Sequence, residues 1–152
     1  MMSASCDNGH LNTDRNSELQ TLEGKVVLSV DDNVDSLLLL SFILSEYGVQ
    51  VITATSASEA LETFARFLPD VLVCDIAMPL EDGYSLIRKI RILPPHLGGV
   101  IPAIALTACA GEEERRRSLE AGFQRHLLKP VEPDELVAVV ASLAGCVEPQ
   151  VA

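Results

Sequence analysis

The chain is poor in basic residues. Its 152 residues include 11 Lys and Arg against 22 Asp and Glu, a formal net charge of −11. A nucleic-acid backbone would be repelled, so we expect no nucleic-acid partner. No apolar run approaches the roughly 20 residues of a membrane span, and residues 1–7 lack the basic and apolar parts of a secretory signal. We therefore expect a cytoplasmic protein without membrane association.

The spacings of several common sites are also missing. The four cysteines, at positions 6, 74, 109 and 146, show no paired spacing, which favours free thiols in a reducing compartment over a disulfide framework or a zinc site. The sequence has no Gly-rich phosphate loop with a lysine, no G-x-G-x-x-G and no G-x-S-x-G. Its length fits a single domain with short tails.

Short apolar runs alternate with helical patterns along most of the chain. The runs predict strands near 25–30, 49–53, 71–75, 101–106 and 126–128. Five such β/α repeats imply an α/β fold, with a doubly wound parallel sheet covered by helices on both faces. We expect a disordered leader at 1–23, one domain at 24–145 and a tail at 146–152.

Two of the expected helices differ in how firmly they should be held. The first begins near Asn33 or Asp35, ends at Gly48 and should be deeply packed, because its apolar residues cover a wide face. These residues are Val34, Leu37, Leu38, Leu40, Phe42, Ile43 and Leu44. The helix at 112–121 has few apolar anchors, chiefly Leu119, and should be the most weakly held.

Four of the expected strands end in polar side chains. They lead into Asp31-Asp32, Asp75, Thr107 and Lys129. The carboxyl ends of parallel strands form one edge of a sheet, where ligands bind in open α/β folds. Helix or turn capping is the alternative role for the aspartates, and a solvated strand end is the alternative for the lysine.

Clustered carboxylates repel one another unless a cation lies among them, and oxygen ligands of this kind suit Mg²⁺. A carboxylate such as Asp75 can attack phosphorus to form an aspartyl phosphate. A lysine and a divalent ion would neutralise the transferring oxygens, and a threonine hydroxyl can hydrogen-bond one of them. The residues therefore predict phosphoryl-transfer chemistry.

Four motifs together resemble the CheY-like receiver domain of two-component response regulators. They are Val30-Asp31-Asp32-Asn33, Asp75-Ile-Ala-Met-Pro with Gly83, Ala105-Leu-Thr-Ala and Leu128-Lys-Pro. The resemblance covers about residues 24–145. It implies a flavodoxin-like (βα)5 fold with strand order 2-1-3-4-5. It also implies a phosphorelay role in which Asp75 accepts a phosphoryl group from the phosphohistidine of a sensor histidine kinase or a histidine phosphotransfer protein.

The same resemblance assigns the remaining site residues. Mg²⁺ would be held by Asp31, Asp32, Asp75 and the backbone carbonyl of Ala77. Thr107 and Lys129 would contact the phosphoryl group, and the Lys129–Pro130 peptide bond would be cis.

One position departs from the family pattern. His126 stands where the family commonly has a Tyr or Phe that switches rotamer together with the threonine. We expect a weakened or altered switch of Thr107 and His126. The switch would remodel a protein-binding face made by the fourth helix (112–121), the fifth strand and the fifth helix.

Several alternatives stay open from the sequence. With no output domain after residue 145, the chain is either a single-domain regulator or a receiver fragment of a hybrid histidine kinase. We expect no enzyme activity beyond phosphoryl transfer to itself and hydrolysis of the acyl phosphate. A phosphorylation-independent binding module is one alternative. A small aspartyl-phosphate phosphatase is another, but it would need an acid two residues after Asp75, where Ala77 stands.

Overall fold

The computed structural model describes residues 22–109 and 111–145. The expected tail at 146–152 and most of the expected leader, 1–21, therefore lie outside the described residues, as do Cys6 and Cys146. Leu22 is fully buried, so the packed domain begins slightly before the expected residue 24. Within the described part of the chain, every helix is too short or too polar to cross a bilayer.

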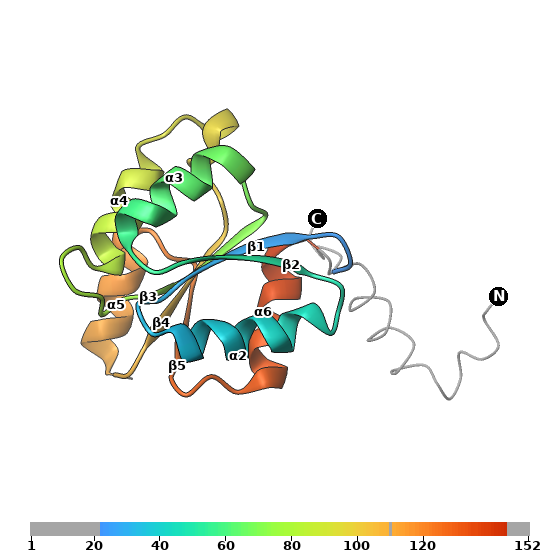
Figure 1. The fold of residues 1–152 in the computed structure, drawn as a ribbon. Coiled ribbons are helices and arrows are strands. Elements are labelled where there is room, and N and C mark those ends of the chain that lie inside the picture. Colours follow the sequence, from blue (N-terminus) through green and yellow to red (C-terminus); the bar gives the residue numbers. More distant parts are fainter. Residues whose placement is uncertain (1–21, 110, 146–152) are drawn as a thin grey trace, which may run out of the picture.

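Five parallel strands form a single sheet in the order β2-β1-β3-β4-β5 (Figure 1). The strands are β1 (Val26–Val30), β2 (Gln50–Ala54), β3 (Val71–Asp75), β4 (Ala103–Thr107) and β5 (Arg125–Leu128). The central strand β3 is buried along its whole length, as its continuous apolar run predicts. Strand β2, whose end contributes none of the polar site residues named above, lies at one edge of the sheet. The predicted fold class and strand order are confirmed.

Helices cover both faces of the sheet. They are α2 (Val34–Ser45), α3 (Ala57–Phe67), α4 (Gly83–Arg91), α5 (Glu112–Ala121) and α6 (Pro133–Leu143). α2 and α6 contribute their buried residues to one core cluster, and α3, α4 and the end of α5 contribute theirs to the other. This is the doubly wound arrangement that right-handed β-α-β crossovers produce, and Figure 1 shows the two layers.

Local sequence signals place most helix ends. The Asn33 side chain caps α2 by accepting a hydrogen bond from the Ser36 N–H, and Ser56 caps α3 through the N–H of Glu59. Glu132 caps α6, with Pro133 in the first turn. The expected loop after α4 contains a short 3-10 helix, Pro95–Leu97, which the sequence patterns do not predict.

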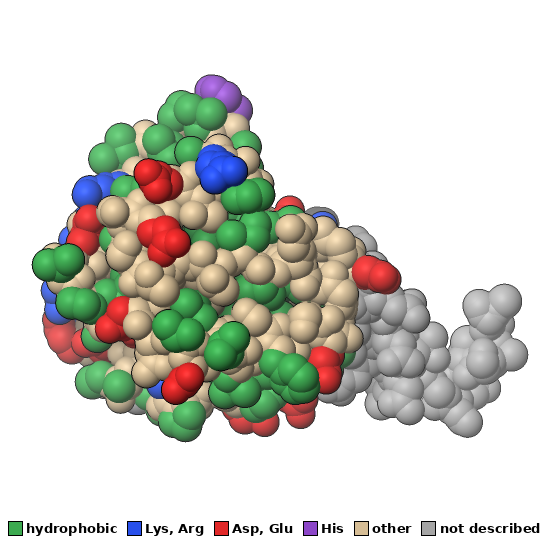
Figure 2. Space-filling view, viewed as in Figure 1, with side chains coloured by type: hydrophobic (Ala, Val, Ile, Leu, Met, Phe, Trp, Pro, Cys, Tyr) green, Lys and Arg blue, Asp and Glu red, His purple; other side chains and the backbone are tan. Residues whose placement is uncertain are grey.

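The prediction that α2 is deeply packed over a wide face is wrong. Only Leu37, Leu40 and Leu44 of the helix are buried. Val34, Leu38, Leu39 and Phe42 are between 57% and 63% exposed. Figure 2 shows hydrophobic side chains gathered on the part of the viewed face where α2 runs. A helix on the outside of a sheet can bury only the stripe that faces it, so the remaining apolar residues of α2 form a solvent-facing surface.

The expected anchor of α5 is also different in the structure. Leu119 is 49% exposed, and the buried residues of this helix are Ser118 and Ala121. The helix therefore has even less apolar attachment than the sequence predicts.

Candidate functional site

The polar strand ends meet at one edge of the sheet. Asp31 and Asp32 follow β1, Asp75 is the last residue of β3, Thr107 is the last residue of β4, and Lys129 follows β5. The register sets these ends side by side, since Val30 pairs with Cys74 and Thr107 pairs with Leu128. The site residues predicted from the four strand ends thus share one rim.

Three carboxylates gather at this rim. One oxygen from each of Asp31, Asp32 and Asp75 lies within 4.8 Å of the other two. Asp31 and Asp75 are buried and Asp32 is exposed, so the cluster opens to solvent on one side. Asp31 is oriented by the Asn33 N–H, which donates to its Oδ1 at 3.0 Å. An open set of carboxylate oxygens is the donor chemistry that Mg²⁺ takes in proteins, so these residues fit the predicted metal.

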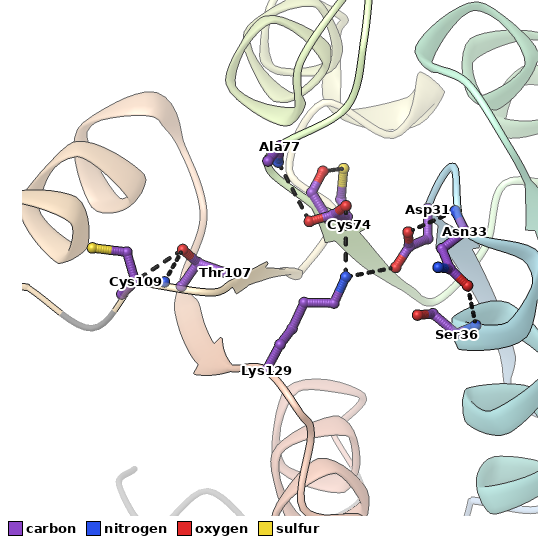
Figure 3. Close-up of polar contacts among 9 residues, drawn as sticks. Asp31, Asn33, Ser36, Cys74, Ala77, Thr107, Cys109 and Lys129 are labelled. Atoms are coloured by element: carbon purple, nitrogen blue, oxygen red, sulfur yellow. Dashed lines mark hydrogen bonds and ion pairs between the residues drawn. The ribbon is translucent and has the colours of Figure 1, made fainter.

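Lys129 reaches into the same cluster. Its Nζ lies 3.1 Å from Asp31 Oδ2 and 3.6 Å from Asp75 Oδ2, and Figure 3 shows the side chain extended toward Asp31. The Lys129–Pro130 peptide bond is cis, as the resemblance implies. The lysine is therefore a charge partner of the acidic cluster and not a solvated strand end.

Burial and neighbouring charge set the electrostatics of Asp75. Burial raises the pKa of its carboxyl group, and the charge of Asp31 raises it further. Lys129 and the backbone N–H of Ala77 act in the opposite direction without cancelling the rise. For Lys129 itself, burial works to lower the pKa, but the two carboxylates outweigh it and the pKa is raised. The lysine therefore stays charged, and the carboxylates carry more negative charge than it compensates.

Thr107 lies at the rim but its hydroxyl is engaged elsewhere. Its Oγ1 accepts a hydrogen bond from the Cys109 N–H at 3.0 Å and lies 3.3 Å from the Cys109 carbonyl oxygen. Figure 3 shows Thr107 and Cys109 together, to one side of the Lys129 amine. The contact of Thr107 with a phosphoryl group, implied by the resemblance, stays a prediction that would require the hydroxyl to turn.

Ala77 and His126 are the two remaining residues to which the resemblance assigns a role. The Ala77 N–H donates to Asp75 Oδ1 at 3.3 Å, while its carbonyl as a metal ligand stays a prediction. His126 lies within β5 and lines a hollow of about 570 Å³ with residues of α5 and α6. Its Nε2 is buried without a hydrogen-bond partner among the described residues. The structure therefore places His126 on the expected protein-binding face and not in the acidic cluster.

The sequence reasoning missed Tyr84. It lies in the first turn of α4, is 2% exposed, and its hydroxyl donates to Glu114 Oε2 at 2.6 Å. Burial raises the pKa of Tyr84, and the hydrogen bond to the Glu114 carboxylate raises it further. Because the partners are 30 residues apart and neither belongs to a motif, no local sequence signal could have identified the pair.

Comparisons with known proteins agree with this geometry. Residues 27–141 match the model of the response regulator receiver domain. An uncharacterized 14.6 kDa protein of Leptolyngbya boryana is 48% identical over 122 residues, which cover 80% of this chain and 92% of that protein. The sensor histidine kinase RcsC of Salmonella typhi is 36% identical over 78% of this chain, but the match spans only 12% of the kinase.

A solved structure shows the same fold. The signal receiver domain of a signal transduction histidine kinase from Syntrophus aciditrophicus superposes with a TM-score of 0.74 at 30% identity. The match covers 84% of this chain and 95% of that domain.

Proposed function

Because the chain belongs to the response regulator receiver domain family of two-component systems, we propose that Asp75 is its phosphoacceptor and that Mg²⁺ assists the transfer. Receiver domains partner with sensor histidine kinases. The observation that carries the proposal is the position of Asp75, a buried carboxylate at a strand end with two further carboxylates and a lysine ammonium around it. This arrangement has the nucleophile and the charge compensation that phosphoryl transfer requires.

The reaction is a transfer from nitrogen to oxygen. An Asp75 carboxylate oxygen attacks the phosphorus of a donor phosphohistidine, the phosphorus–nitrogen bond breaks, and the imidazole leaves with the bonding electron pair. Lys129 compensates negative charge on the transferring oxygens from its position 3.6 Å from Asp75 Oδ2. When bound, Mg²⁺ would be held by Asp31, Asp32 and Asp75 and would supply further charge neutralisation.

The donor is a phosphohistidine of a sensor kinase or of a histidine phosphotransfer protein. This part of the proposal is supported by the likeness to the sensor histidine kinase RcsC. We propose no catalysis on other substrates. A single-domain regulator and a receiver fragment of a hybrid histidine kinase both stay as alternatives, and the cytoplasmic location stays a prediction.

The output is a conformational change that a second protein reads. Phosphorylation draws the Thr107 hydroxyl from the Cys109 backbone toward the phosphoryl group, and His126 and α5 shift with it. The target binds the face made by α5, β5 and α6. Support for this face comes from its hollow, from the unpartnered Nε2 of His126 within the described residues, and from the weak attachment of α5.

Acetyl phosphate with Mg²⁺ tests the phosphoacceptor directly. We expect intact-mass spectrometry to show one phosphoryl group on the wild-type chain and none on Asp75→Asn. Asp134→Asn, in the first turn of α6, is the matched control and should be labelled like the wild type. Equal labelling of Asp75→Asn and the wild type would place the chemistry on another residue.

A further inference from the structure

The first half of α5 is held to the domain by polar contacts. Its buried residues, Ser118 and Ala121, both lie in the second half of the helix. Gly111 precedes the helix without a side-chain capping bond. The first turn consists of the acidic residues Glu112, Glu113 and Glu114, so it contributes no apolar side chain to the core. A helix end attached in this way can move at low cost.

Tyr84 of α4 contacts this helix end. Glu114 Oε2 accepts a hydrogen bond of 2.6 Å from the tyrosine hydroxyl. The guanidinium carbon of Arg117 lies 4.5 Å from the centroid of the tyrosine ring, within the range of a cation–π contact. Glu114 and Arg117 are three residues apart and therefore share one side of α5. The Tyr84 side chain is thus held at its hydroxyl by Glu114 and on its ring face by Arg117.

The position of Tyr84 is tied to the loop that follows Asp75. Its neighbour Gly83 donates its N–H to the Ile76 carbonyl oxygen at 2.9 Å. A Cβ on Gly83 would lie 2.8 Å from the Asp75 carbonyl oxygen and 2.9 Å from Ile76 Cα, so α4 begins in direct contact with the backbone of the phosphoacceptor. Tyr84 can therefore serve as a fixed point against which α5 moves.

Glu114 follows Thr107 by one short loop. In the structure the Thr107 hydroxyl is bonded to the Cys109 backbone, so the first turn of α5 has the position that goes with a Thr107 hydroxyl not yet turned toward Asp75. A displacement of Thr107 toward Asp75 would carry this segment with it, while Tyr84 would stay with the phosphoacceptor loop. The contact between Tyr84 and α5 thus joins two segments that the proposed switch moves apart.

We propose that Tyr84, Glu114 and Arg117 form a latch that holds α5 in its unphosphorylated position and opens when Asp75 is phosphorylated. This inference rests on the proposed function and adds a regulatory element to it. A contact present in only one of two states shifts the equilibrium toward that state by its own free energy. A hydrogen bond to a charged acceptor is worth enough to change the equilibrium constant about tenfold. The latch therefore sets how readily the domain switches.

The phosphoryl analogue beryllofluoride, added with Mg²⁺ to the full chain, tests the latch. NMR titration, followed at the α5 backbone amides, gives the affinity of each variant for beryllofluoride. Tyr84→Phe keeps the ring and removes the hydroxyl, and Glu114→Ala removes the same bond from the other helix. We expect both variants to bind beryllofluoride about five- to tenfold more tightly than the wild type.

Two control variants belong to the experiment. Glu113→Ala removes a neighbouring exposed acid that pairs with Arg116, and Tyr47→Phe removes the other tyrosine hydroxyl. Both should match the wild type. Glu114 is partly exposed on α5, so Glu114→Ala should fold normally. It removes the same hydrogen bond and therefore still tests the latch if Tyr84→Phe folds poorly.

The outcomes separate the latch from the proposed function. A wild-type chain that binds beryllofluoride, with Glu114→Ala binding no more tightly, would overturn the latch alone. A wild-type chain that does not respond to beryllofluoride and takes no phosphoryl group from acetyl phosphate would overturn both.

Discussion

At the residue scale, the rim of the sheet contains an imbalance of charge that a ligand can correct. Asp31 and Asp75 are buried beside each other, and one lysine serves both of them. The pKa of Asp75 is raised because burial and Asp31 together outweigh Lys129. A divalent cation would offset this excess of negative charge, and the proposed phosphoryl transfer would depend on that cation because a phosphoryl group adds further negative charge.

Tyr84 shows a second residue-scale effect, which alkaline titration can measure. In a Tyr47→Phe background Tyr84 is the only tyrosine, and the chain has no Trp, so tyrosinate absorbance reports Tyr84 alone. We expect its pKa to lie above the roughly 10 of a free tyrosine, because burial and the bond to Glu114 both disfavour the phenolate. Adding Glu114→Ala should lower the pKa toward its ordinary value.

The sign of the linked stability effect follows from the same shift. The folded pKa is raised, so the stability that the neutral phenol contributes is fully present below about pH 10 and is lost as the pH rises through the folded pKa. Glu113→Ala is the control and should leave the titration unchanged. A pKa that does not fall in Glu114→Ala would show that the hydrogen bond is absent in solution.

At the scale of single elements, α2 and α5 contrast. α2 buries three leucines and leaves four large apolar residues in solvent, whereas α5 buries little and depends on polar contacts. The first is firmly anchored with an apolar outer surface, and the second is loosely anchored. This difference agrees with a switch in which α5 moves and α2 stays in place.

Paired substitutions in α2 test which of its sides is packed. Leu40→Ala removes a side chain that is 5% exposed and should lower the free energy of unfolding by about 2–5 kcal/mol. Phe42→Ser changes a side chain that is 63% exposed and should change it by less than about 0.5 kcal/mol. Urea unfolding measures both. A large loss in Phe42→Ser would mean that the outer side of α2 is covered in solution.

At the scale of the whole molecule, the net charge of −11 makes nonspecific cation effects unavoidable. Any salt screens the repulsion among surface carboxylates and raises stability somewhat. A specific Mg²⁺ site must therefore be recognised by saturation and by its dependence on particular aspartates.

Thermal unfolding with and without Mg²⁺ makes that distinction. At matched ionic strength, we expect Mg²⁺ to raise the Tm of the wild type along a saturating curve, because an ion at 100 times its Kd stabilises the fold by about 2.7 kcal/mol. Asp32→Asn should lose most of this rise. Asp35→Asn changes an exposed acid of α2 outside the carboxylate cluster and should keep it. An equal rise in all three proteins would mean that Mg²⁺ only screens charge.

The sequence by itself determined the fold and the rim. The β/α alternation, the helix caps at Asn33 and Ser56 and the polar residues at strand ends are local signals, and a parallel sheet necessarily brings its carboxyl ends together. The cis bond before Pro130 came from the family resemblance and is confirmed.

Only the tertiary structure decided which side of α2 is covered, where His126 lies and what holds α5. An apolar stripe does not reveal how much of it a neighbouring layer can cover, because that depends on how closely helix and sheet pack. The bond between Tyr84 and Glu114 joins residues 30 positions apart on two helices, and its geometry exists only once both helices are docked on the sheet.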